Sequence, residues 1–377
     1  MVKFRLKEVV NSIVSGITIN HCSKGTYPVY GSTGIIGYTN THDYSGERIL
    51  IARVGANAGA TNIVCGEYGV SDNTLVITVN SEYETKYIYY YLKHKKLNQF
   101  VFGSSQPLIT GSLLKNISLY IPDKMSQQHI VKALSDVDGM ISSLEKLVAK
   151  YKSIKTACLQ QMFPQNGETV PRMRLPGFTG VWEQRKLGEI GQTYTGLSGK
   201  TKDDFGHGQA RFVTYMNVYS NPISNPEMTE PIEIDPKQNE VEVGDVFFTT
   251  SSETPEEVGM SSILLEKRGK TYLNSFCFGF RPSEKIDSYY LAYMLRSESA
   301  RAKITLLAQG ISRYNISKNK VMEIAVSLPS LDEQKMIGQY FSQLDNLITL
   351  HQRKLKKVQK IKQGMMQQLL TGKIRLV

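Results

Sequence analysis

Two long segments of the 377-residue sequence match each other at one constant spacing. The first begins at Pro122 and the second at Pro329, 207 positions later. Identical residues at this spacing include Pro122/Pro329, Gln127/Gln334, Ile130/Ile337, Ser135/Ser342, Asp138/Asp345, Ile141/Ile348, Ile154/Ile361, Lys155/Lys362, Gln160/Gln367 and Gln161/Gln368. Because self-similarity at a fixed period indicates repeated structural units, the chain is expected to be built as two related halves.

Both segments carry apolar residues at alternating steps of four and three. The two series are Ile130, Leu134, Val137, Ile141, Leu144, Val148, Tyr151, Lys155, Cys158 and Met162, and Ile337, Phe341, Leu344, Ile348, His351, Leu355, Val358, Lys362, Met365 and Leu369. This spacing is typical of a coiled-coil seam. We therefore expect two helices of about 38 residues, or roughly 57 Å each, that pair with each other inside the chain; the alternative is pairing with another subunit.

Two lysines interrupt this apolar stripe. Lys155 and Lys362 occupy seam positions in the first and second segments. Either their ammonium groups reach solvent at the edge of the seam, or the stripe shifts there to Ile154 and Ile361.

The segments ahead of the helices also correspond, although more loosely. Residues 5–9 resemble 186–190, and residues 46–51 resemble 244–249, where a turn leads into a buried strand. The other matched predictions are strands 75–79 and 275–280, tyrosine-rich helices 85–98 and 288–303, and closing strands 116–121 and 323–328.

These correspondences predict an α+β fold with a pseudo-two-fold internal repeat: two similar globular domains separated by two long antiparallel coiled-coil helices. The expected parts are domain 1 (1–121), a central spacer helix (122–163), a linker (164–181), domain 2 (182–328) and a C-terminal spacer helix (329–377). The linker is rich in Pro and Gly, so we expect no helix there. Trp182, the only tryptophan, is expected to pack at the start of domain 2.

The charge of the chain favours an anionic partner. Its formal net charge is +11, which suits nucleic acid or an acidic membrane surface. The sequence has no signal-peptide pattern and no apolar run near 18 residues, so we expect a cytoplasmic protein without membrane contact. The four cysteines are widely spaced and the six histidines scattered, which predicts no metal site and no disulfide framework.

The motifs that would indicate catalysis or cofactor binding are incomplete or absent in this sequence. Gly31, Gly34 and Gly37 are spaced GxxGxxG rather than GxGxxG. Lys200 follows Gly199 as in a phosphate-binding loop, but Tyr194 stands where the first glycine is required. No Asn/Asp-Pro-Pro-Tyr/Phe or GxSxG sequence occurs. The chain itself is therefore expected to have no catalytic residues and to bind no cofactor.

Arg, Lys, Asn, Gln, Ser and Thr side chains on loops are the groups that contact phosphates and base edges. In domain 1 the candidate DNA contacts are Lys24, Ser32, Thr33, Tyr38, Arg53, Asn57, Asn73, Ser104, Ser105 and Gln106. In domain 2 they are Lys200, Lys202, Arg211, Tyr215, Asn217, Ser251, Ser252, Gln309, Arg313 and Tyr314. Gln106 and Arg313 fall in comparable loops, which favours both. The alternative for each residue is a solvated loop position.

Two stretches resemble a known family. Residues 174–189 (RLPGFTGVWEQRKLGE), and 329–334 (PSLDEQ) leading to 367–373 (QQLLTGK), resemble specificity subunits of type I restriction-modification enzymes. The resemblance covers essentially the whole chain. One departure is that no copy of the LPGFTG segment precedes Phe4, which concerns how domain 1 docks at its start.

The resemblance implies a non-catalytic subunit whose two domains each read half of a split double-stranded DNA sequence, while the helix pair sets the unread spacer. It further implies two modification subunits that carry S-adenosylmethionine, and restriction subunits that use ATP and Mg²⁺. Half-sites one or two DNA turns apart lie about 34–70 Å apart, which such helices can span. The alternatives are a methyltransferase or nuclease in its own right, or a coiled-coil scaffold with incidental charge.

Overall fold

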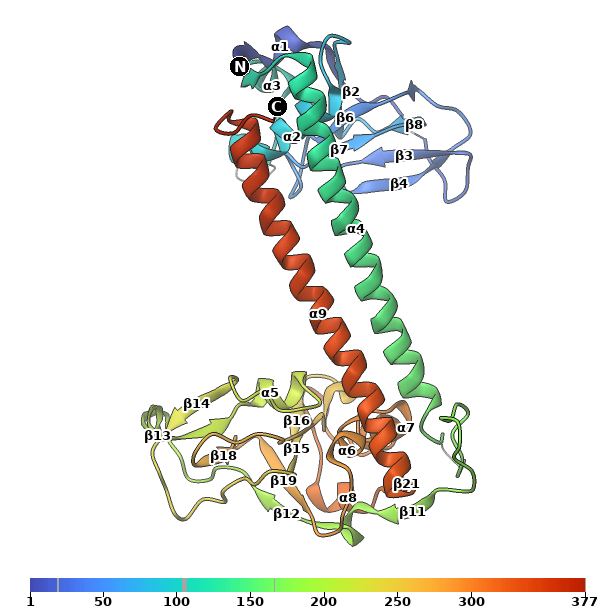
Figure 1. The fold of residues 1–377 in the computed structure, drawn as a ribbon, viewed down its shortest axis with the longest axis vertical. Helices are drawn as coiled ribbons and strands as arrows, with labels where there is room; N and C mark the ends of the chain where they lie inside the picture. The colour runs from blue at the N-terminus through green and yellow to red at the C-terminus, as the bar shows by residue number, and fades with distance from the viewer. Residues whose placement is uncertain (19, 104–106, 166, 377) are drawn as a thin grey trace. The chain divides into compact units, whose positions relative to one another are not determined.

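A computed structural model describes residues 1–18, 20–103, 107–165 and 167–376. The contacts divide the chain into two compact units, residues 1–146 with 352–377, and residues 147–351. Two long helices, α4 (Lys124–Gln161) and α9 (Leu331–Leu370), each contribute to both units (Figure 1).

Unit 1 contains two four-stranded sheets and a short closing strand pair. The strands are β1 (Val2–Arg5), β2 (Val10–Ser15), β3 (Tyr27–Gly31), β4 (Gly34–Thr39), β5 (Tyr44–Ser45), β6 (Arg48–Ala52), β7 (Thr61–Val64), β8 (Glu67–Val70), β9 (Thr74–Val79) and β10 (Ser118–Ile121). The sheet orders are β2-β9-β6-β7 and β4-β3-β8-β5, and β1 pairs with β10. The short helices are α1 (Leu6–Val9), α2 (Thr85–His94), η1 (Leu97–Phe100) and α3 (Gly111–Lys115).

Unit 2 repeats this plan, but its second sheet has three strands, and the central one is nine residues long. Its strands are β11 (Glu183–Lys186), β12 (Gly191–Thr195), β13 (Phe205–Val213), β14 (Thr229–Ile232), β15 (Val246–Thr249), β16 (Ser251–Ser252), β17 (Ser261–Ile263), β18 (Thr271–Leu273), β19 (Cys277–Pro282), β20 (Tyr314–Asn315) and β21 (Ala325–Leu328). The orders are β12-β19-β15-β17, β14-β13-β18, β16-β20 and β11-β21. The helices are η2 (Leu187–Glu189), η3 (Lys202–Asp204), α5 (Tyr215–Ser220), η4 (Pro255–Glu257), α6 (Ser288–Met294), α7 (Glu298–Thr305) and α8 (Lys318–Met322).

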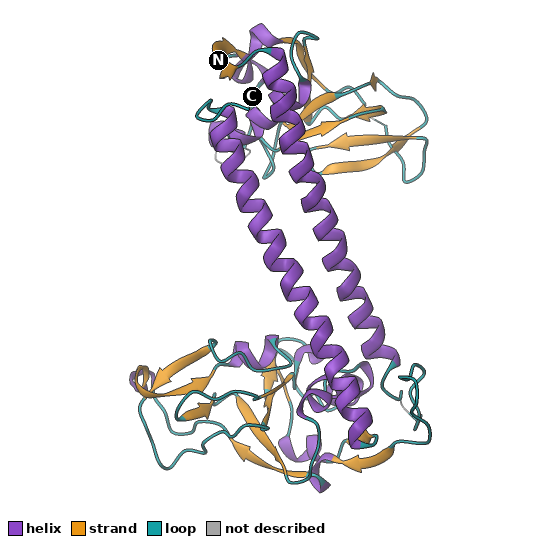
Figure 2. Ribbon diagram, in the orientation of Figure 1, coloured by secondary structure: helices purple, strands orange, loops and turns teal. Residues whose placement is uncertain are grey.

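The two units share connectivity as well as content (Figure 2). Strand β2 lies at the edge of its sheet beside β9, as β12 lies beside β19. Strand β3 pairs in parallel with β8, as β13 does with β18. The predicted internal repeat and the α+β fold class are therefore confirmed.

Within each unit the long helices pack on the domain and on each other. In unit 1 the seam residues Ile130 and Leu134 of α4 share a core with Met366 and Leu369 of α9. In unit 2, Cys158 of α4 shares a core with Ile337, Phe341 and Leu344 of α9. The helices thus run antiparallel, and the predicted pairing inside the chain is the arrangement observed in each unit. Burial of these apolar side chains provides the main driving force for the pairing.

Both tyrosine-rich helices are shorter than predicted. The expected helix 85–98 ends at His94, and Lys96 then adopts a positive φ of 49°, which a helix cannot continue through. The expected helix 288–303 is two helices, because Ser297 caps a new one by accepting a hydrogen bond from Ala300 N. Both predictions of one continuous helix were wrong.

The seam lysines form ion pairs instead of reaching solvent. The alternative shift of the stripe is confirmed at Ile154, which packs against the core of unit 2, but not at Ile361, which is 47% exposed. In unit 2, Lys155 Nζ lies 2.6 Å from Asp345 Oδ1 and 5.3 Å from the ring centre of Tyr293. The Tyr293 hydroxyl donates to Asp345 Oδ2 at 2.9 Å. Burial first, and then the nearby Asp345 carboxylate, raise the pKa of Tyr293, so the phenol remains a donor.

Unit 1 contains the equivalent triad. Lys362 is paired with Asp138 and lies over the ring of Tyr90, whose hydroxyl donates to Asp138 Oδ2 at 2.8 Å. Each triad joins α4, α9 and the tyrosine-rich helix of its domain, which is α2 in unit 1 and α6 in unit 2.

Removing Lys155 is expected to destabilise unit 2. In Lys155→Met the Asp345 carboxylate loses its cation and keeps only the tyrosine hydroxyl, so we expect a loss of about 1–3 kcal/mol in the free energy of unfolding. Urea denaturation followed by circular dichroism measures it. The matched control is Lys150→Met on an exposed position of the same helix; equal losses in both variants would contradict the role of the triad.

The linker is packed at its end. Trp182 is 2% exposed, and its ring centre lies 6.5 Å from that of Phe163 and 6.1 Å from that of Tyr290, so the expected packing role is confirmed. The guanidinium of Arg174 makes two 2.8 Å hydrogen bonds to the buried carboxylate of Glu333, which ties the linker to the start of α9.

None of the helices in the described part of the chain combines the length and the apolar character needed to span a membrane.

Candidate nucleic-acid interface

Two loops occupy equivalent positions in the two units. An antiparallel bridge closes one between Phe102 and Leu108, and another closes the second between Gln309 and Asn315, again 207 positions apart. Each loop is tied to the segment after a central strand, by Ile109 N to Arg53 O at 2.9 Å and by Ile316 N to Thr250 O at 3.0 Å. The predicted residues Ser104, Ser105 and Gln106 lie outside the described residues.

Arg313 is presented by the loop of unit 2. Its Nε donates to Ser251 Oγ at 2.7 Å, and Ser251 is only 5% exposed. Arg313 itself is exposed, and within the described part of unit 2 its two terminal nitrogens have no hydrogen-bond partner. A guanidinium held at Nε keeps both terminal nitrogens for a bidentate contact with guanine or phosphate.

Neighbouring residues hold this arrangement in place. Tyr215 donates its hydroxyl to Ser251 O at 2.7 Å. Tyr314 and Ser252 pair through their backbones, and the Ser252 hydroxyl lies near Glu257. The structure therefore brings Tyr215, Ser251, Ser252, Gln309, Arg313 and Tyr314 together around one loop.

The tip of this loop contains a residue that sequence reasoning missed. Ile311 is 96% exposed and follows Gly310, whose φ is 145°. A Cβ on Gly310 would lie 2.0 Å from Arg313 O, so the tight loop requires glycine there. An apolar tip can contact a thymine methyl group in the major groove. The available signal was one isoleucine within a polar, glycine-containing loop.

Lys200 is not a free phosphate ligand. Its Nζ lies 2.9 Å from Asp235 Oδ2 and 3.9 Å from Asp204 Oδ1, and its side chain is 13% exposed. The hydrogen bond with Asp235 raises the pKa of Lys200 and lowers that of Asp235. Two carboxylates surround this ammonium, so Lys200 has a structural ion-pair role in unit 2, and its DNA contact stays a prediction. Lys202, in η3, is exposed and stays a prediction.

Two more candidates in domain 2 have structural roles. Arg211 donates to Thr229 Oγ1 at 2.6 Å and to Thr229 O at 2.5 Å. Asn217 is fully buried, and its amide bonds to Asn225 O at 2.8 Å and Met228 O at 3.1 Å. The prediction for Asn217 was wrong because DNA cannot reach a buried and satisfied amide. Arg211 is half-buried and held by Thr229 through two of its nitrogens, so its DNA contact stays a prediction.

In unit 1, Ser32 and Thr33 form the turn between β3 and β4. This turn borders a hollow of about 500 Å³ whose lining also includes Leu50, Asn62 and Cys65. Gly34 adopts a φ of 107°, which lets the hairpin reverse within two residues. Ser32, Thr33 and Asn62 therefore line the same hollow.

The other candidates of domain 1 divide into two groups. Arg53 lies at the base of the Phe102–Leu108 loop, where its N–H donates to Asn73 O at 2.9 Å and its Nη1 to Ser15 Oγ at 3.1 Å. Asn57 is exposed in the turn that follows Arg53. Lys24 and Tyr38 lie elsewhere, near the Cys22–Tyr38 bridge, and both are exposed. Among the residues that the structure describes, no bridge or hydrogen bond joins Lys24 or Tyr38 to the Phe102–Leu108 loop.

Arg296 supports the interface from beneath, and sequence reasoning missed it. Its Nη2 donates to the carbonyls of Val218, Tyr219 and Asn221 at 2.8–3.0 Å. Its Nε donates to Ser261 O at 2.7 Å. Burial lowers the pKa of Arg296 to about 10, so it stays charged at neutral pH. A cation at these carbonyls stabilises the C-terminal end of α5, the helix that carries Tyr215.

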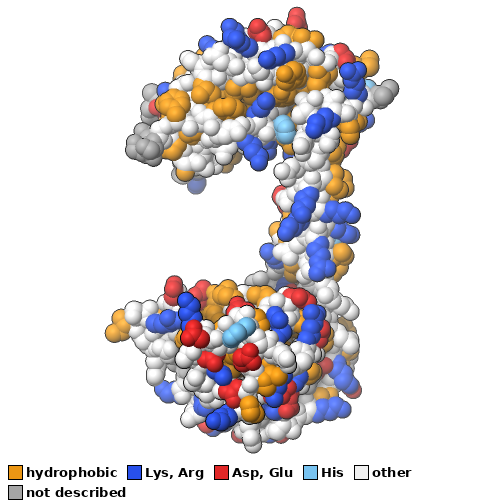
Figure 3. Space-filling model, turned by 90° about the vertical axis from the view of Figure 1, so that its left-hand side faces the viewer, with side chains coloured by type: hydrophobic (Ala, Val, Ile, Leu, Met, Phe, Trp, Pro, Cys, Tyr) orange, Lys and Arg blue, Asp and Glu red, His pale blue; other side chains and the backbone are white. Residues whose placement is uncertain are grey.

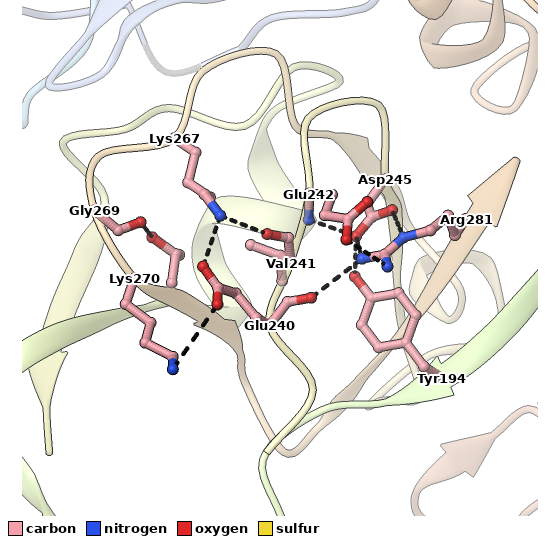
Figure 4. A network of polar contacts seen from close by, with 10 residues as sticks. Tyr194, Glu240, Val241, Glu242, Asp245, Lys267, Gly269, Lys270 and Arg281 are labelled. Atoms are coloured by element: carbon pink, nitrogen blue, oxygen red, sulfur yellow. Dashed lines mark hydrogen bonds and ion pairs between the residues drawn. The ribbon is translucent and has the colours of Figure 1, made fainter. Parts of the chain in front are cut away.

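A second polar network in unit 2 is closed on itself (Figure 4). Asp245 is 1% exposed and accepts two 2.8 Å hydrogen bonds from Arg281 and one of 2.6 Å from the Tyr194 hydroxyl. Lys267 lies 2.7 Å from Glu240 in the same group. The cations and carboxylates of this network pair with one another, and Tyr194 and Arg281 come from the neighbouring strands β12 and β19. The network therefore has a structural role in unit 2. Across the described ranges, no three His, Cys, Asp or Glu residues are placed to hold a metal ion.

Comparison with known proteins shows what this architecture resembles. A family model described as the type I restriction modification DNA specificity domain matches residues 1–155 and 180–360. The type I restriction enzyme MjaVIII specificity subunit of Methanocaldococcus jannaschii is 25% identical over 359 residues, covering 87% of this chain and 79% of the relative. The putative MjaX specificity subunit of the same organism is 25% identical over 323 residues, covering 81% and 72%.

Solved structures show the same fold. The S subunit of a type I restriction-modification system from M. genitalium has a TM-score of 0.61 at 16% identity, covering 98% of this chain and 96% of that one. A chain from a structure on complex assembly and conformational transition of the type I R-M system has a TM-score of 0.58 at 15% identity, covering 98% and 97%.

Proposed function

The chain belongs to the type I restriction-modification DNA specificity family and is a DNA specificity subunit, and from this premise we propose that it reads a bipartite DNA target. Each domain contacts one half-site, and the bases between the half-sites are not read. The supporting observation is the pair of equivalent loops, Phe102–Leu108 and Gln309–Asn315, each closed by the same bridge and tied to the same part of its domain.

The two readers have different contact residues on a common frame. At the loop position where domain 2 has Arg313, domain 1 has Gln106. Arginine pairs best with guanine and glutamine with adenine, so the two half-sites have different sequences. One frame carrying two different readers accounts for strong similarity in the helices and weak similarity in the loops.

The partners of the proposed complex supply the chemistry. Two modification subunits with S-adenosylmethionine methylate adenines, and restriction subunits use ATP and Mg²⁺. This chain is non-catalytic, binds no cofactor and acts in the cytoplasm by directing those subunits to the target. In support, the Asn/Asp-Pro-Pro-Tyr/Phe sequence that an adenine methyltransferase needs to hold the flipped base does not occur in this chain.

Mapping methylated adenines tests this function. The chain is co-expressed with the modification subunits of its own system in a methylation-free host, and modified adenines are located by long-read sequencing. We expect one motif with two specified halves and a constant unspecified spacer. A continuous motif, or DNA methylation by this chain alone, would overturn the proposal. As a control, exchange of residues 1–121 for another specificity subunit's first domain should change one half only.

A further inference from the structure

The positive charge of the chain is concentrated at its C-terminal end. Residues 346–377 contain eight Lys and Arg residues and no Asp or Glu. This segment therefore carries a large share of the net charge of the whole chain, which is +11. Five of these cations fall within two turns of α9: Arg353, Lys354, Lys356, Lys357 and Lys360. All five are exposed, and within the described part of unit 1 none has an ion-pair partner.

The cations lie away from the helix seam. At 3.6 residues per turn, Arg353, Lys356 and Lys360 fall within about 60° of one another, on the side opposite the seam residues. In Figure 3 Lys and Arg side chains gather on the face of the long helices turned toward the viewer. We call Arg353, Lys356 and Lys360 the basic face. Lys354 and Lys357 instead border an apolar hollow with Met140, Leu144 and Val358.

Such a face is unfavourable without an anion. Lys356 and Lys360 are four residues apart and Arg353 and Lys356 three apart, so like charges are neighbours and destabilise the helix. An anionic ligand relieves this repulsion. The face extends about 10 Å along the axis, the length of about three base-pair steps.

The sequence repeat indicates which anion fits. The positions of α4 equivalent to Arg353, Lys356 and Lys360 are Lys146, Ala149 and Ser153, so the face is not repeated. A site for two copies of one partner subunit would be expected on both helices. A single duplex of DNA is bound once, and its unread segment carries two phosphates per base pair that the readers do not neutralise.

We propose that the basic face of α9 contacts the phosphates of the unread spacer. The inference rests on the proposed bipartite function and adds that the helix pair binds DNA as well as connecting the readers. The contact is independent of sequence because phosphates carry no base information. It contributes affinity and favours spacers whose backbone follows the helix.

The test compares two triple variants in complex with the modification subunits. Arg353→Gln/Lys356→Gln/Lys360→Gln removes the face, and Lys3→Gln/Lys7→Gln/Lys132→Gln removes three exposed charges elsewhere in unit 1. Binding to the mapped target is measured against salt concentration. We expect the first variant to lose about 2.7 from the slope of log affinity against log salt and about tenfold in low-salt affinity. The control should change little.

Modified DNA makes the test independent of protein folding. Methylphosphonate linkages confined to the spacer should reduce the slope of the wild-type complex to that of the first variant and leave that variant unaffected. The inference is overturned if the first variant keeps the wild-type slope, or if the wild-type complex keeps its slope on the modified DNA. In either case the mapped bipartite motif still stands. Failure of the first variant to assemble with the modification subunits, while the control variant assembles, would show that the face binds a protein partner and would also overturn the inference. A continuous methylation motif would instead refute the proposed function.

Discussion

Arg313→Ala is expected to weaken binding of the assembled complex to its target about tenfold to a hundredfold and to relax specificity at one position of one half-site. The reason is that Ser251 holds Nε of Arg313 and leaves its terminal nitrogens for a bidentate contact worth about 1–3 kcal/mol. Binding titrations with a library of targets, each carrying one altered base pair, measure both effects.

Two further variants separate contact from positioning. Arg313→Lys retains the charge but loses the planar guanidinium, so both the DNA affinity of the complex and its base specificity should fall. Ser251→Ala removes only the acceptor for Nε and should cost less, because the guanidinium remains. The hypothesis fails if Arg313→Ala leaves both affinity and specificity of the complex unchanged.

Replacing Arg296 is expected to have the largest effect on stability. Arg296→Met leaves four carbonyl oxygens of unit 2 without their donor and deletes the cation at the end of α5. Each buried carbonyl group left without a donor costs about 1–3 kcal/mol, so we expect a total loss of about 3–5 kcal/mol in the free energy of unfolding. Thermal and urea unfolding of the purified chain measure the loss.

The matched control for Arg296 is Arg268→Met. Arg268 is exposed and pairs only with surface carboxylates, Glu227 and Glu266, so its removal should cost at most about 1 kcal/mol. Similar losses in the two variants would show that the carbonyl cluster does not depend on Arg296. Because α5 carries Tyr215, a folded Arg296 variant should also bind DNA more weakly.

The long helices and the matched strands could be predicted because their signals are local and periodic. The heptad spacing of residues such as Ile130 and Leu134 predicts a helix face directly, and the fixed offset adds a second copy. The end of the tyrosine-rich helix at His94 and the new cap at Ser297 could not be predicted so well. Both depend on single backbone conformations that composition only weakly favours.

The candidate interface was predicted less well than the fold. The loop of Arg313 was predicted because a comparable polar loop precedes the last strand of domain 1, and the bridges of the structure place the two loops 207 positions apart. Asn217 and Lys200 were chosen by residue type alone, but the Asn217 amide is buried and bonds to Met228 O, 11 positions away, and Lys200 pairs with Asp235. Arg296 was missed for the same reason, since its four acceptors lie 35 to 78 positions away.

The sequence by itself determined that the chain is a tandem repeat with two pairing helices, because periodicity and a constant offset survive without knowledge of contacts. Only the tertiary structure decided what the polar residues do. Lys155 and Lys362 break the apolar stripe in sequence, yet each meets an aspartate and a tyrosine from other elements. The physical reason is that a charged side chain is defined by its partners, and folding, rather than sequence order, brings those partners together.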